Sequence, residues 1–135
     1  MPPETRSRVM SRIRGSNTKP ELAIVEGLKR RGVAWDAHVR ALPGCPDFVF
    51  AESRVVVFVD GDFWHGYRFD EWRDKLSEKW EAKIEGNIIR DRQSRKKLRQ
   101  DGWKVIRIWE HQVEKDKARC VRRILAALDP PKTLP

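Results

Sequence analysis

An unbroken run of apolar, mostly β-branched residues, Val55-Val-Val-Phe-Val59, is the feature that most constrains the fold of this chain. Such residues favour extended backbone, and no proline interrupts the run. A similar stretch, 47–51, precedes it, and the polar pair Glu52-Ser53 separates the two. This pattern predicts a β-hairpin with strands over 47–51 and 54–59, the second of which is central in a sheet.

A helix is predicted before the hairpin. Thr18-Lys-Pro-Glu21 combines an N-cap, an early proline and a glutamate three residues after the cap, which is a capping box. The helix should end at about Arg31, before Gly32, and bury Leu22, Val25 and Leu28. A strand is expected next, over 33–39.

Caps and periodicity predict three further elements after the hairpin: a helix from Ser77 to about Asp101, a strand over 103–109 and a helix over about 113–128. Helices before and after a mixed sheet indicate an α/β sandwich. The length of 135 residues fits a single domain, spanning 1–135. Residues 1–17 are expected to form a basic arm and residues 129–135 a flexible tail.

The chain is strongly basic, with 29 Lys and Arg against 20 Asp and Glu and a net charge of +9. This balance favours a polyanionic partner such as nucleic acid. No stretch approaches the roughly 18 apolar residues of a membrane-spanning helix, and the N-terminus has no apolar signal segment. We therefore expect a cytoplasmic protein with no membrane partner, in which Cys45 and Cys120 stay reduced.

Acidic residues stand at the ends of the predicted hairpin strands. Asp47 follows Pro46 and opens the first strand, and Asp60 follows the second. Phosphodiester hydrolysis needs a hard cation that neutralises developing charge and activates water, and Mg²⁺ prefers oxygen ligands such as carboxylates. Neighbouring strand ends could gather such ligands, although a turn-capping aspartate is the ordinary interpretation. Glu21 is a third candidate, and its place in the capping box is the alternative role.

The segment between Asp60 and Gly66 carries the other candidate groups. His65 could transfer a proton near neutral pH, or it could be structural. Phe63 and Trp64 follow neither helical nor strand periodicity, so they are either core residues or a wedge that enters between base pairs. Their position in a predicted loop favours the wedge.

The long predicted helix carries a dense basic face. Arg90, Arg92 and Arg95 belong to it and are expected to face phosphates. Asn87 and Asp91 lie one helical turn apart, so they form either a hydrogen-bonding pair, a surface pair, or a site in which Asp91 orients a histidine.

Several motifs, in order and with compatible spacing, together resemble the very short patch repair (Vsr) mismatch endonucleases of the PD-(D/E)xK restriction-endonuclease-like superfamily. They cover most of the chain: Met10-Ser-Arg-Ile13, Asn17-Thr-Lys-Pro-Glu21, Leu42-Pro-Gly-Cys-Pro-Asp-Phe48, Val57-Phe-Val-Asp-Gly-Asp-Phe-Trp-His65, Lys83-Ile-Glu-Gly-Asn87, Arg90-Asp-Arg92, and Gly102-Trp-Lys-Val105 to Trp109-Glu110. The resemblance implies a three-layer sandwich in which helices flank a mixed central sheet.

The resemblance also implies a reaction, a nick in one strand of duplex DNA beside a T:G mismatch left by deamination of 5-methylcytosine. Two Mg²⁺ ions would serve it, bridged by Asp47 and helped by the main-chain carbonyl of Val59, while Glu21 acts through metal-bound water. His65, oriented by Asp91, is assigned to acid/base work. The residues that contact DNA would include the wedge, the arm and the long helix: Met10, Arg12, Arg14, Phe63, Trp64, Asn87, Arg90, Arg92 and Arg95.

Two departures from the family pattern bear on these expectations. Asp60 stands where the best-known members have a histidine, so it is a candidate further metal ligand or base. The positions that hold a structural zinc in the family are here Asp62, Tyr67, Phe69 and His111. Because Tyr67 and Phe69 cannot supply the usual zinc ligands, we predict no structural zinc and a direct pairing of Asp62 with His111.

The leading hypothesis is a monomeric, Mg²⁺-dependent endonuclease that nicks mismatched double-stranded DNA at the bacterial nucleoid. Mismatch-repair proteins or a cytosine methyltransferase are candidate cooperating partners. A first alternative is a nicking nuclease of the same fold without strict T:G specificity, acting in restriction or phage defence. A second is a DNA-binding module without catalysis, against which the joint presence of Glu21, Asp47, His65 and Asp91 argues.

Overall fold

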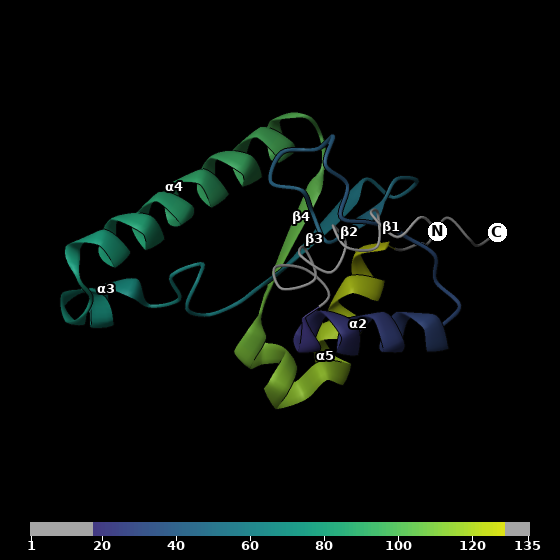
Figure 1. The fold of residues 1–135 in the computed structure, drawn as a ribbon. Coiled ribbons are helices and arrows are strands. Elements are labelled where there is room, and N and C mark those ends of the chain that lie inside the picture. Colours follow the sequence, from purple (N-terminus) through teal and green to yellow (C-terminus); the bar gives the residue numbers. More distant parts are fainter. Residues whose placement is uncertain (1–17, 129–135) are drawn as a thin grey trace, which may run out of the picture.

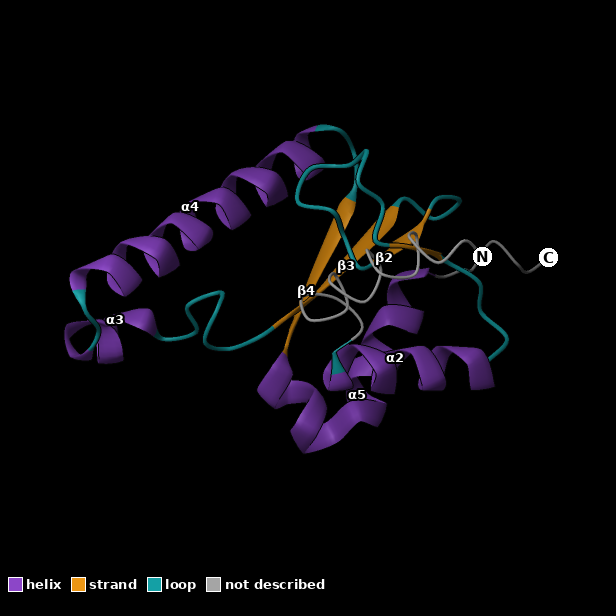
Figure 2. Ribbon diagram, viewed as in Figure 1, coloured by secondary structure: helices purple, strands orange, loops and turns teal. Residues whose placement is uncertain are grey.

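The computed structural model describes residues 18–128, so the predicted arm over 1–17 and tail over 129–135 lie outside the described residues. The described residues form both helices and strands (Figures 1 and 2). In order they are α2 (Lys19–Arg30), β1 (Asp36–Ala37), β2 (Phe48–Phe50), β3 (Val55–Asp60), α3 (Phe69–Trp72), the 3-10 helix η1 (Arg73–Lys75), α4 (Glu78–Gln100), β4 (Lys104–Trp109) and α5 (Glu110–Leu128).

The strands of the described residues form one mixed sheet in the order β1-β2-β3-β4. β2 and β3 are the predicted antiparallel hairpin, in which Val49 lies opposite Val56. β4 pairs with β3 in parallel, so that Val55 lies opposite Lys104 and Asp60 opposite Trp109. The apolar run is therefore central, as predicted, and the last residue of β3, Asp60, lies beside the last residue of β4.

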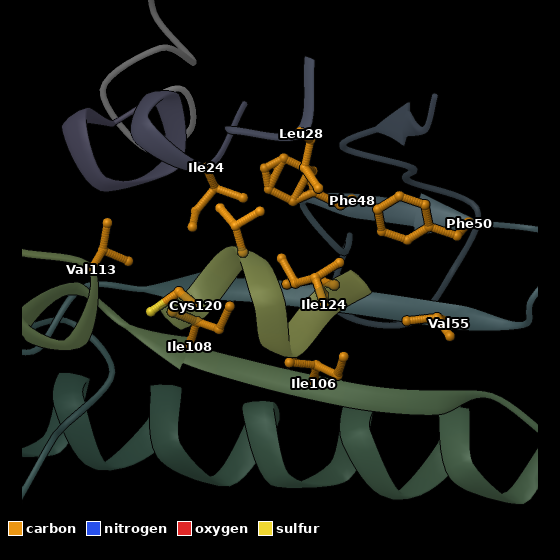
Figure 3. Packing of buried hydrophobic residues seen from close by; sticks show 12 residues of the cluster. Ile24, Leu28, Phe48, Phe50, Val55, Ile106, Ile108, Val113, Cys120 and Ile124 are labelled. Carbon is orange, nitrogen blue, oxygen red and sulfur yellow. The ribbon is translucent and has the colours of Figure 1, made fainter. Parts of the chain in front are cut away.

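The two faces of the sheet are covered by different helices, which makes the fold the predicted three-layer α/β sandwich. Val55 and Val57 of β3 point to the face that α2 and α5 cover, where the larger core lies (Figure 3). Val56 and Phe58 point to the opposite face and pack with Leu98 of α4. Burial on both faces accounts for a strand that is apolar at successive positions.

Close contact between α2 and α5 sets the position of the first helix. Gly27 lies against Val121, and a Cβ at this glycine would come within 2.6 Å of the valine Cγ2. This crossing turns Ile24 and Leu28 into the core and leaves Leu22 half exposed. The prediction that Leu22 belongs to the buried face was wrong, because the neighbouring helix and not the helix's own sequence selects the buried face.

The predicted strand over 33–39 was also wrong in extent, since only Asp36 and Ala37 pair with β2. The amide of Val33 still closes the end of α2 by donating to Leu28. Regular strand backbone ends at Ala37, because the φ of 48° at His38 lies in the left-handed region, although the His38 amide still donates to the Asp47 carbonyl.

The caps predicted most helix boundaries well. The Thr18 side chain accepts from the Glu21 amide, and the Ser77 side chain accepts from the Trp80 amide, so α2 and α4 begin where expected. The final helix instead begins at Glu110, directly after β4, with non-helical backbone at Asp116. The start of α4 and the adjoining α3 extend away from the sheet (Figure 1). Among residues 18–128, no helix is long and apolar enough to cross a bilayer.

Candidate active site

Asp47 lies at the start of β2, where its side chain faces the end of β3. Its amide donates to the Val57 carbonyl, and its Oδ2 accepts from the Val59 amide at 2.7 Å. Burial, followed by the nearby charge of Glu21, raises the pKa of Asp47 to about 8. The fold thus holds this carboxylate in a place where its negative charge is unfavourable.

Glu21 and His38 complete a first group around Asp47, which we call the Glu21 cluster. Glu21 belongs to the first turn of α2 and is only 3% exposed. Its Oε2 is hydrogen-bonded to Nε2 of His38, and the same nitrogen lies 3.8 Å from Oδ1 of Asp47. One potential ligand atom from each of the three residues lies within 4.8 Å of the others. The α2 cap and the strand pairing therefore bring together three side chains able to bind a divalent cation.

A second group, the His65 cluster, consists of Asp60, His65, Asp91 and Arg107. His65 Nδ1 is hydrogen-bonded to Asp91 Oδ2 at 2.6 Å, and its Nε2 lies 3.7 Å from Asp60 Oδ1. Arg107 donates from Nε to Asp60 Oδ2 at 2.7 Å and places a second nitrogen 3.6 Å from Asp91 Oδ2. Of the three arrangements left open for Asp91, the structure therefore has the one in which it orients a histidine.

The charges of the His65 cluster set the protonation of the imidazole. Burial lowers the pKa of His65, but the hydrogen bond to Asp91 and the charges of Asp60 and Asp91 outweigh it, so the pKa is raised above its ordinary value. Asp60 and His65 also act on the pKa of Asp47 through their charges. The two clusters are thus electrostatic neighbours, one on each side of the end of β3.

A hollow of about 660 Å³ opens beside Asp60 and His65 of the His65 cluster. The start of α2, the end of β3 and the following loop line it: Thr18, Pro20, Val59, Asp60, Gly61, Phe63, Trp64, His65 and Glu110. Gly66 closes the loop with a φ of 72° against Ile88 of α4, where a Cβ would meet the isoleucine side chain at 2.4 Å. The hollow therefore offers space for a substrate beside His65 and the end of β3.

Exposed aromatic side chains stand at the edge of this hollow. Phe63, Trp64 and Trp80 are 42%, 48% and 40% exposed, and their rings contact one another. Trp72 stacks on Phe63 with ring centroids 5.4 Å apart and anchors its Nε1 on the Tyr67 carbonyl. Phe63 and Trp64 are therefore not core residues, and the wedge role stays a prediction.

The basic residues predicted on the long helix divide into two groups. Arg90 and Arg92 are exposed on α4, while Arg95 is half buried. Burial and the neighbouring charge of Arg107 lower the pKa of Arg95, which places this side chain near the His65 cluster. Asn87 does not pair with Asp91 in this structure; it donates to the Trp64 carbonyl and accepts from Arg90. The predicted contacts Met10, Arg12 and Arg14 lie outside the described residues.

The predicted pairing of Asp62 with His111 is confirmed. Asp62 Oδ1 lies 2.9 Å from His111 Nδ1, and the ring of Tyr67 packs on the imidazole with centroids 4.3 Å apart. Glu110 accepts from the Asp62 amide at 3.1 Å. The absence of structural zinc stays a prediction, supported by this direct contact.

Sequence reasoning missed four residues that the structure brings to the site. His38 was assigned only to a strand, yet a hairpin register extended backwards from Phe48 would have placed it beside Asp47. Arg107 was a charged residue within an otherwise apolar strand pattern, which was a usable signal. No comparable sequence signal exists for Trp72 and Trp80, because only the folded loop brings their rings to Phe63.

Comparison with known proteins identifies the family. The sequence profile described as DNA mismatch endonuclease Vsr matches residues 1–71, more than half of the chain. A type II nicking enzyme of Neisseria meningitidis serogroup C is 36% identical over 129 residues, covering 93% of this chain and 87% of its own. A type II nicking enzyme of Xanthomonas oryzae is 36% identical, with 95% of each chain covered.

The DNA mismatch endonuclease Vsr of Escherichia coli is also similar, with 36% identity over 108 residues, which cover 78% of this chain and 69% of its own. The chain belongs to the Vsr family and is a DNA endonuclease.

Proposed function

We propose that this endonuclease nicks one strand of duplex DNA beside a T:G mismatch in a Mg²⁺-dependent reaction. The observation that carries the proposal is the Glu21 cluster. Two carboxylates stand close together there with little exposure, and the pKa of Asp47 is raised to about 8 by burial and by Glu21. A divalent cation would relieve this unfavourable charge, as expected of a site built to bind one.

The residues present fit such a cation. Asp47 and Glu21 supply carboxylate oxygens of the kind Mg²⁺ prefers, and the Val59 peptide lies beside Asp47, where its carbonyl would be a further ligand. When bound, the metal would neutralise charge on the scissile phosphate and lower the pKa of a water molecule. Two ions are expected by resemblance to the family, and Asp60 remains a candidate ligand, although Arg107 already engages its Oδ2.

His65 is suited to the proton transfer that completes the cut. Its Nδ1 is committed to Asp91, which fixes the ring and leaves Nε2 directed toward Asp60. The raised pKa of His65 favours the protonated imidazole near neutral pH. We assign to it the donation of a proton from Nε2 to the leaving oxygen.

DNA binding is assigned to the aromatic edge and to α4. Phe63 and Trp64, joined by Trp80, present exposed rings beside the hollow and are suited to unstacking a base pair next to the cut. Asn87 holds the Trp64 carbonyl, while Arg90, Arg92 and Arg95 are expected to face the phosphate backbone. The arm with Met10, Arg12 and Arg14 is expected to clasp the duplex.

A nicking assay on matched, T:G and other mismatched duplexes tests the reaction. Asp47→Ala should lower nicking of the T:G duplex by about 10³-fold or more, because several kcal/mol of charge stabilisation are lost with the metal. Binding of the duplex should change little. Asp101→Ala is a matched control, since this aspartate ends α4 beside the start of β4, away from the clusters. Nicking by Asp47→Ala at the wild-type rate would refute the assignment.

The aromatic wedge needs a separate experiment. Phe63→Ala combined with Trp64→Ala should bring the rates on T:G and matched duplexes closer together by about tenfold, since base unstacking costs a few kcal/mol per step. Leu22→Ala, which removes another half-exposed apolar side chain, is the control. A ratio of rates that is unchanged in the double variant would exclude the wedge role.

A second candidate function is nicking without strict T:G preference, in restriction or defence. The names of the nicking-enzyme relatives support it, because they state nicking and no mismatch. The same panel separates the two, since equal rates on matched and T:G duplexes would favour the second candidate.

A further inference from the structure

His38 is directed at the place where the metal of the proposed function would bind. Its Nε2 is hydrogen-bonded to Glu21 and lies 3.8 Å from Asp47 Oδ1, so one nitrogen faces both carboxylates. The three potential ligand atoms lie within 4.8 Å of one another, a spacing at which a single cation can contact all three. The imidazole is therefore part of this site and not a neighbour of it.

The backbone holds His38 in this position. β1 ends at Ala37, and the next amide, that of His38, still donates to the Asp47 carbonyl at 3.2 Å. The following amide, that of Val39, donates to the Pro46 carbonyl, so the two segments of the chain stay in register beyond β1. His38 itself has a φ of 48°, a left-handed conformation that is uncommon for a residue with a side chain. Such conformations persist where the surrounding structure enforces them, and they concentrate at functional sites.

We propose that His38 is a protein ligand of the metal centre, which it binds through Nε2 together with Glu21 and Asp47. The proposal rests on the metal dependence of the proposed function and adds a nitrogen ligand to it. For this, the hydrogen bond between His38 and Glu21 must give way to a shared contact with the ion. The competing possibility is that His38 only positions Glu21 and never contacts the metal.

A nitrogen ligand changes which metals the site prefers. Carboxylate and carbonyl oxygens suit Mg²⁺, whereas imidazole is a better ligand for the later divalent metals of the first transition row. Mg²⁺ would still bind through Asp47 and Glu21. Mn²⁺ and, more strongly, Co²⁺ should bind more tightly than Mg²⁺, and the advantage should depend on His38.

Pulsed electron paramagnetic resonance of bound Mn²⁺ tests the ligand directly, because a coordinated imidazole produces a ¹⁴N modulation of the electron spin echo. The measurement uses the full chain, both alone and bound to a T:G duplex whose scissile phosphate is replaced by a non-cleavable linkage. Four proteins are compared: wild type, His38→Gln, His65→Gln and His111→Gln. The last is the matched control, because His111 pairs with Asp62 outside both clusters.

The expected result is a nitrogen modulation in wild type, in His65→Gln and in His111→Gln, and its loss in His38→Gln. Modulation that persists in His38→Gln but disappears in His65→Gln would overturn the proposal and assign the nitrogen to the His65 cluster. Bound Mn²⁺ without nitrogen modulation in wild type would overturn it as well, while the metal-dependent function would stand. Wild-type protein that binds no Mn²⁺, alone or with DNA, would contradict both.

Affinity provides a second readout that does not depend on catalysis. By calorimetric titration, His38→Gln should weaken Mn²⁺ binding by at least about tenfold, the smallest effect typical even of residues in the outer shell of a metal site. Mg²⁺ binding should weaken less. If His38 only positions Glu21, both affinities should fall by the same factor, and that result would overturn the proposal.

Discussion

The Glu21 cluster and the His65 cluster lie on either side of the end of β3, and they handle negative charge in opposite ways. Arg107 contacts both carboxylates of the His65 cluster, so that group carries its own cation. In the Glu21 cluster, His38 contacts both carboxylates, and the pKa of Asp47 is raised to about 8. The contrast supports the proposed roles, in which the Glu21 cluster binds an external cation and the His65 cluster transfers a proton.

The largest effect on nicking that tests this contrast should come from substitution of His65 in the His65 cluster. His65→Ala should slow nicking by about 10²- to 10⁴-fold, the range for loss of a general acid. Metal affinity, measured by calorimetry, should stay near that of wild type. His111→Ala serves as the control, and a His65 variant that loses metal binding would break the division between the clusters.

Removal of the Arg107 guanidinium should change both the stability of the protein and the pH profile of nicking. Arg107→Met removes the guanidinium partner of Asp60 and Asp91 and leaves His65 to face both carboxylates, so denaturant unfolding should show a loss of about 2 kcal/mol or more. Arg107 also lowers the pKa of His65, so without it that pKa should rise further.

If protonated His65 donates the proton, nicking by Arg107→Met should therefore persist to higher pH than nicking by wild type. Arg123→Met, at an exposed arginine that donates to the Arg107 carbonyl, is the control, because it removes a guanidinium from outside both clusters. A profile shifted to lower pH would contradict the assigned role of His65.

Asp47→Asn should stabilise the metal-free protein. The pKa of Asp47 is raised from 3.8 to about 8 in the folded state, so the folded protein holds a proton there that the unfolded chain releases between these values. Wild-type stability contributed by this group therefore falls as pH rises from about 4 to about 8. The asparagine variant should gain up to about 5 kcal/mol at pH 8 and little at pH 4, since each unit of pKa shift corresponds to about 1.4 kcal/mol. A constant difference across this pH range would exclude the burial of an unfavourable charge.

The parts of the fold that depend on interactions between residues close in sequence were predictable. The apolar run at 55–59, the caps Thr18 and Ser77 and the alternation in β4 each act within a few residues, and the corresponding elements appear where expected. The buried face of α2 was not predictable, because α5 selects it through Val121 at Gly27. β1 was predicted too long because nothing local reveals the left-handed backbone of His38.

The same distinction applies to the site. Asp47, Glu21, His65 and Asp91 were found because they stand in motifs or at strand ends, and the structure brings them into the two clusters. His38 and Arg107 come from strands whose partners lie elsewhere in the chain, at Asp47 and at Asp60. Their contribution depends on the tertiary pairing of β1 with β2 and of β3 with β4, which motif spacing does not encode.

The division of labour between the clusters is tested most directly by thermal unfolding with and without Mg²⁺. At about 100 times its dissociation constant, an ion that binds only the folded state adds about 2.7 kcal/mol, which raises the melting temperature of a domain of this size by roughly 5–15 °C. Wild type and His65→Gln should show this rise, and Asp47→Asn should show almost none. A full rise in Asp47→Asn together with its loss in His65→Gln would contradict the account.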